Sequence, residues 1–206
     1  MDGPITFGLD PFLCWPPGGT PPGGSILSHA MTAIVAIDVF KRKAAAKRGF
    51  AAWKKRFGFG FNERTGFGDL PDPVLFTLAR PGQEATAALW ELILGALNLA
   101  ACQDFGDLSP ADRMAVVDIQ LLLADQARFE MMVRLDWLTD YPCAGSSLLD
   151  LVLSFGKTNR SGHTLCLAPS HPDYLSCEKL TARDREMLIR RMLPLALEAF
   201  RLRLES

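Results

Sequence analysis

The sequence contains little of what most catalytic motifs require. Only three histidines occur in 206 residues, and there is no Cys-x-x-Cys pair and no Gly-x-Ser-x-Gly nucleophile elbow. The tripeptide Gly156-Lys157-Thr158 has the ending of a phosphate-binding loop, but Leu151 stands where that loop needs glycine. An enzyme is therefore the less favoured hypothesis. A helical enzyme or small-ligand-binding protein would use residues 157–177, which begin with an unusual polar loop.

The chain also has no recognisable export signal and no segment long enough to cross a membrane. The first 24 residues carry no basic cluster. The apolar run over residues 25–40 is 16 residues long and includes His29 and Asp38, whereas a membrane span needs about 20 apolar residues. Five cysteines are an odd number and widely spaced, which is typical of buried thiols in a reducing compartment. We therefore expect a cytoplasmic protein without a transmembrane segment.

Residues 1–24 are predicted to form an arm that precedes a single helical domain over residues 25–206. The arm holds six prolines and six glycines, which oppose helix formation. It also carries large apolar side chains such as Phe7, Phe12 and Trp15. These side chains favour an arm that lies across the protein's own body or across a partner. In a dimer, one subunit's arm would cover the surface of the other.

The rest of the chain predicts a mainly α fold of five to seven helices packed around a central apolar helix at about residues 84–105. That segment is apolar almost all round, which is typical of a helix buried by its neighbours. Helix start signals precede the other segments: Asp72, Ser109, Ser146 or Ser147, and Thr181. A loop with two prolines, expected to be irregular, comes before the last helix, and Pro194 predicts a kink within that helix.

The stretch "HTLCLAPSHPDYLSC" concentrates the few histidines and cysteines of the chain. His163, Cys166, His171 and Cys177 have the spacing His-x2-Cys-x4-His-x5-Cys. Four such ligands are what tetrahedral zinc requires. The spacing is similar to that of retroviral-type zinc knuckles, although a histidine replaces the first cysteine and the last gap is one residue longer. Zinc is the only cofactor this pattern predicts, and the alternative is an apolar loop with buried thiols and half-exposed histidines.

A basic and aromatic segment covers residues 41–61. Residues 1–60 hold eight Lys/Arg against three Asp/Glu, a net of +5, while the remainder holds 14 against 20, a net of −6. Phosphate contacts by cations and stacking by aromatic rings would bind nucleic acid. The candidate residues for this are Lys41, Arg42, Lys47, Arg48, Trp53, Lys54, Lys55 and Arg56.

Residues 41–61 have other interpretations as well. The cations would also suit the solvated face of an amphipathic helix whose Val39, Phe40, Phe50 and Trp53 point inward, or pairing with the acidic part of the fold. Binding to an anionic membrane surface or to an acidic protein is a further possibility. Later in the chain, Asp118 and Asp125, with the pair Glu130 and Arg134, are expected on a solvated helix face.

Taken together, these patterns favour a cytoplasmic helical binding or assembly protein. Its partner would be another protein or a second copy of the chain. The alternatives are the helical enzyme or small-ligand-binding protein that uses residues 157–177, and the nucleic-acid-binding protein that uses residues 41–61.

Overall fold

A computed structural model describes residues 39–99, 105–156 and 164–206. They belong to one compact unit that begins at Asp38. The predicted arm, His29 and His163 lie outside the described residues.

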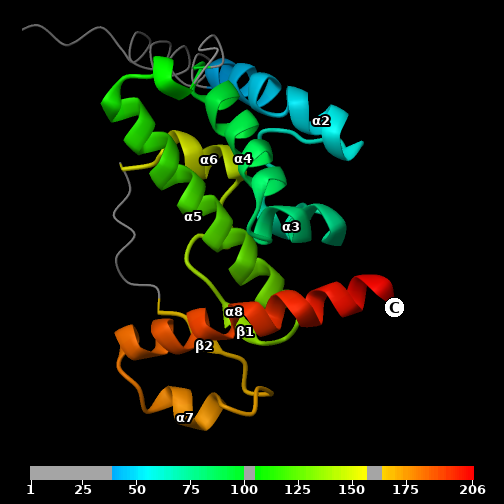
Figure 1. Ribbon diagram of the computed structural model, residues 1–206, viewed down its shortest axis with the longest axis vertical. Helices are drawn as coiled ribbons and strands as arrows, with labels where there is room; N and C mark the ends of the chain where they lie inside the picture. Colours follow the sequence, from blue (N-terminus) through cyan, green and yellow to red (C-terminus); the bar gives the residue numbers. More distant parts are fainter. Residues whose placement is uncertain (1–38, 100–104, 157–163) are drawn as a thin grey trace, which may run out of the picture. The chain divides into compact units, whose positions relative to one another are not determined.

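The described residues are mainly helical, as the sequence predicts (Figure 1). Residues 39–49 are helical. The helices that follow are α2 (Ala51–Phe57), α3 (Asp72–Ala79), α4 (Gln83–Ala96), α5 (Pro110–Arg134), α6 (Leu148–Leu153), α7 (Tyr174–Glu178) and α8 (Ala182–Glu205). Two short 3-10 turns are η1 (Phe67–Asp69) and η2 (Phe105–Asp107). Strand β1 (Leu138–Asp140) pairs antiparallel with β2 (Cys166–Leu167).

Local start signals are confirmed at three helices. The side chains of Ser109, Ser147 and Thr181 each accept a hydrogen bond from the backbone N–H three residues further on, at the starts of α5, α6 and α8. Each of these caps satisfies one of the helix's free N–H groups. Helix α6 ends at Leu153, and Gly156 then adopts a positive φ of 74°, which glycine takes without steric cost.

Other element boundaries differ from the prediction. Helix α3 begins at Asp72 rather than being capped by it, and Pro71 is the cap residue. Helix α4 ends at Ala96, before the predicted end near residue 105, because Asn98 turns to a positive φ of 61°. The loop expected to be irregular contains α7, since Pro172 lies before its first turn and therefore does not interrupt it.

Helix α5 lies at the centre of the packing, in contact with α3, α4, α6 and α8. Helix α8 crosses α5 near the C-terminal end of α5 (Figure 1). The helix over residues 39–49 approaches α4 closely at a pair of glycines, where a Cβ on Gly95 would lie 2.8 Å from the Arg48 carbonyl oxygen. Gly49 is the last residue of the helix over residues 39–49, and a Cβ there would lie 3.1 Å from the Leu92 carbonyl oxygen of α4.

No helix in the described ranges is both long and apolar enough to span a membrane.

Candidate functional site

The basic segment forms the helix over residues 39–49 and the following α2, and its arginines bind the rest of the fold. Arg42 pairs with Asp150 at the start of α6. Arg48 donates from Nε to the Gly95 carbonyl oxygen at 3.1 Å, near the end of α4. Arg56 makes a two-pronged ion pair with Glu91, and hydrogen bonding to that carboxylate raises the pKa of Arg56. These three cations therefore bind groups within the fold. This agrees with the interpretation that the basic segment pairs with the rest of the protein.

The aromatic residues of the segment pack together. Phe50 and Trp53 are buried, and the Trp53 ring lies 5.5 Å from Phe57 and 5.3 Å from Phe61 between centroids. The Trp53 indole N–H donates to the Ala88 carbonyl oxygen of α4 at 2.6 Å. Of the phenylalanines after α2, Phe59 is the exposed one, at 37%. Trp53 is therefore not placed to stack on a nucleic-acid base.

The lysines of the segment differ from its arginines. Five lysines are exposed and make no hydrogen bond or ion pair with any described residue: Lys41, Lys43, Lys47, Lys54 and Lys55. Val39 and Phe40, which were expected to point inward, are exposed as well. Nucleic-acid binding through this segment stays a prediction, now supported by charge rather than by stacking.

The described members of the predicted zinc cluster do not converge. Cys166 lies on β2, Cys177 is buried on α7, and the His171 ring packs edge-on against Trp137 at 5.5 Å. Nδ1 of His171 accepts a hydrogen bond from the Asp173 backbone N–H. Within the described ranges, no three His, Cys, Asp or Glu side chains come close enough together to hold a metal ion. His163 is outside these ranges.

Cys166 and Cys177 instead line one small cavity of about 120 Å³. Arg185 approaches the Cys166 sulfur, with 3.9 Å between Nη1 and Sγ. The Tyr174 hydroxyl donates to Glu178 at 2.7 Å, and this bond raises the pKa of Tyr174. Ligand pockets usually enclose about 300–1,000 Å³. The cavity is therefore too small for most metabolites, and residues 164–177 offer weak support for the enzyme hypothesis.

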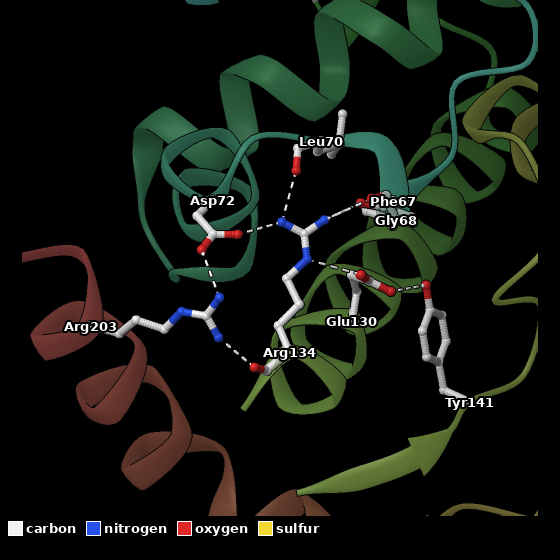
Figure 2. A network of polar contacts seen from close by, with 8 residues as sticks. All are labelled: Phe67, Gly68, Leu70, Asp72, Glu130, Arg134, Tyr141 and Arg203. Atoms are coloured by element: carbon white, nitrogen blue, oxygen red, sulfur yellow. Dashed lines mark hydrogen bonds and ion pairs between the residues drawn. The ribbon is translucent and has the colours of Figure 1, made fainter. Parts of the chain in front are cut away.

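A partly buried polar network at the C-terminal end of α5 is a feature that the sequence did not reveal (Figure 2). The Arg134 guanidinium donates to Glu130 at 3.0 Å, to Asp72 at 2.5 Å and to the carbonyl oxygens of Phe67, Gly68 and Leu70. The second oxygen of Glu130 accepts the Tyr141 hydroxyl at 2.9 Å. The expectation that Glu130 and Arg134 occupy a solvated helix face is therefore wrong. Their spacing of four residues is the same on a solvated and on a buried face.

Arg203 of α8 completes this network. It donates to the Arg134 carbonyl oxygen at 2.5 Å and pairs with Asp72 at 3.4 Å. Figure 2 shows the Arg134 guanidinium enclosed by these groups. All five guanidinium hydrogens of Arg134 are engaged, so this side chain joins α5 to α3 and η1, and Arg203 links the same network to α8.

The N-terminal half of α5 presents an exposed apolar stripe. Met114, Val117 and Leu121 follow one another at three and four residues and are 67%, 38% and 59% exposed. The exposed carboxylate of Asp118 lies beside them and pairs with no described residue. The spacing is visible in the sequence, but which face of the helix is covered depends on the fold.

The outer face of α8 also exposes large apolar side chains. Met187, Leu195 and Leu202 are 44%, 66% and 54% exposed. Arg191 and Glu198 lie between them and are exposed too. Faces of this kind mark interaction surfaces more often than isolated apolar side chains do.

Comparison of the chain with family models, with curated proteins and with solved structures found no match.

Proposed function

We propose that this protein is a helical binding or assembly protein, and that the apolar stripe of α5 docks a helix of a partner protein. The single observation that carries the proposal is the exposure of Met114, Val117 and Leu121 on one uncovered helix face. Contacts at three, four and seven residues are the pattern by which one amphipathic helix binds another. Burying these side chains against a partner would remove apolar surface from water, which favours association.

The charge beside the stripe defines the partner further. Asp118 is exposed next to the apolar side chains and has no cation from the described residues. A partner helix with Lys or Arg flanking its apolar face would satisfy this carboxylate, whereas an acidic helix would be repelled. The partner we propose is therefore a basic amphipathic helix of another protein.

A photo-cross-linking side chain placed at position 114 or 121 tests the proposal. Each position is expected to give one discrete adduct in cells that express the protein, and a cross-linker at the exposed Lys179, which follows α7, is expected to give none. The adduct would be identified by mass spectrometry, and its partner would be purified for a binding titration.

In that titration the double variant Met114→Asp/Leu121→Asp is expected to bind at least about tenfold more weakly, because two charges would be forced into an apolar contact. The matched control Gln83→Asp/Ser176→Asp adds the same charge at exposed polar positions and is expected to bind normally. Equal binding by both double variants, or no discrete adduct at 114 and 121, would contradict the proposal.

A further inference from the structure

The outer face of α8 has a pattern that the α5 stripe lacks. Its residues alternate apolar and charged at three and four residues: Met187, Arg191, Leu195, Glu198 and Leu202. They lie opposite the buried face of the same helix, formed by Ile189, Met192, Ala196 and Phe200. The pattern is symmetric about the midpoint between Pro194 and Leu195. Met187 is as far from this point as Leu202, and Arg191 is as far as Glu198.

We infer that a second copy of this chain docks on α8, with the two α8 helices antiparallel and a two-fold axis near Pro194 and Leu195. In this arrangement residues equally far from the axis face each other across the contact. Met187 of each copy meets Leu202 of the other, and Arg191 of each copy meets Glu198. Leu195 and Pro194 lie together at the axis, so apolar side chains meet apolar ones along the whole seam.

The charges select this direction of pairing. A parallel pair would place Arg191 against Arg191 and Glu198 against Glu198, which is unfavourable at both positions. The antiparallel pair forms two Arg–Glu contacts instead. Arg191 is free for this role, because it makes no ion pair with any described residue, whereas Arg190 and Arg201 each make two and Arg203 makes one.

Glu198 is available as well, although it pairs with Arg201 within the helix at 2.6 Å. Arg201 also binds Glu205 at 2.5 Å, so it keeps an acidic partner when Glu198 turns toward the second copy. The Glu198 side chain is more than half exposed, at 58%. Its reorientation breaks a two-pronged but solvent-exposed pair with Arg201 and forms an ion pair across the dimer.

The size of the contact sets the expected affinity. A specific interface usually buries about 800 Å² on each partner through some 20–30 residues. One helix face contributes fewer residues than this, so the dimer is expected to be weak, with a dissociation constant on the order of 10 µM. This dimer involves α8 and a second copy of the chain, whereas the proposed function involves α5 and a different protein. The two proposals can therefore be tested independently.

Sedimentation of the full chain over a range of concentrations tests the inference through charge reversal. The wild-type chain is expected to dimerise. Arg191→Glu and Glu198→Arg each place like charges opposite one another twice, so each alone is expected to raise the dimer dissociation constant at least about tenfold. An equimolar mixture of the two variants restores both Arg–Glu contacts and is expected to dimerise like the wild type.

The control Lys179→Glu makes a reversal of the same kind outside α8 and is expected to leave the dimer unchanged. All reversed residues are exposed, so loss of folding does not confound the result. A wild-type chain that stays monomeric at concentrations about tenfold above the expected constant would overturn the inference, as would variants that dimerise alone or fail to dimerise when mixed. Loss of the dimer in Met114→Asp/Leu121→Asp would assign self-association to α5 and overturn it too.

Discussion

The two halves of α5 carry similar apolar side chains, but only one half is tied to the rest of the fold by polar contacts on several sides. In the C-terminal half, Arg128 donates to the Ala79 carbonyl oxygen of α3 at 3.1 Å, and Asp125 pairs with Arg190 of α8 at 2.7 Å. The Arg134 network lies at the end of this half. In the N-terminal half, Gln120 bonds to Thr86 and Trp90 of α4, and the opposite face exposes Met114 and Leu121.

An apolar helix face is therefore not by itself evidence of a core. Met132 and Met114 are chemically identical and lie on the same helix, yet Met132 is fully buried and Met114 is 67% exposed. What separates them is whether another element crosses that part of α5, as α8 does near the C-terminal end. The N-terminal half of α5 packs on α4 with one face and leaves the face of Met114 and Leu121 available to a partner.

The largest expected loss of stability comes from removing Arg134, the central side chain of the polar network at the end of α5. Arg134→Met would leave the buried Glu130 and the carbonyl oxygens of η1 without their cation. Breaking a buried pair by removal of one partner typically costs about 3–5 kcal/mol of unfolding free energy. Urea denaturation measures this loss. Arg113→Met, in the other half of α5 and without a described partner, is expected to change stability by less than about 0.5 kcal/mol. Equal effects would remove the contrast between the halves.

Two leucines of α5 that lie two residues apart allow the stability cost of truncating a buried and an exposed side chain to be compared. Leu123 is fully buried and Leu121 is 59% exposed. Leu123→Ala is expected to cost about 2–5 kcal/mol because it removes buried methyl groups and leaves a cavity. Leu121→Ala is expected to cost less than about 0.5 kcal/mol in the isolated chain. A large loss for Leu121→Ala in thermal or urea unfolding would mean that the stripe is covered within the chain and is not a docking surface.

The smallest expected effect concerns Tyr141. Burial, together with the adjacent Glu130 carboxylate, raises the pKa of Tyr141 above its ordinary value of about 10. Above about pH 10 the unfolded chain therefore releases a proton that the folded chain keeps, so this contribution to stability is complete below pH 10 and is lost as the pH rises.

Tyr141→Phe removes both the titration and the hydrogen bond to Glu130. It is expected to cost about 1–3 kcal/mol at neutral pH, since a buried carboxylate oxygen loses its donor. Between about pH 9 and pH 11 the variant's unfolding free energy is expected to fall less steeply than that of the wild type. Parallel pH profiles from urea denaturation would show that Tyr141 is not held neutral in the folded protein.

Much of the helical framework could be predicted because its signals are local. Ser109 and Thr181 lie directly before the helices they cap, and Pro110 suits the first turn. The end of α4 was less predictable, since Asn98 is compatible with both a helix and a left-handed turn. Phe50 and Trp53, at the start of α2 and within it, were correctly expected inside, whereas Val39 and Phe40 on the preceding helix lie outside.

The candidate sites were harder to predict, because binding and metal sites depend on contacts between distant residues. The spacing of Cys166, His171 and Cys177 suits zinc, yet two of them line a small cavity and the third packs on Trp137. Glu130 and Arg134 read as an ordinary surface pair, although Phe67 and Leu70 lie more than sixty residues earlier in the chain and close the network around Arg134.

The helical class, the starts of α5, α6 and α8 and the symmetric spacing along α8 follow from the sequence alone, because each depends on neighbours within a few residues. The tertiary structure alone decided which faces of α5 and α8 are covered, and which cations are bound or free. The physical reason is that helical periodicity defines an apolar face, whereas burial of that face requires another element to pack against it.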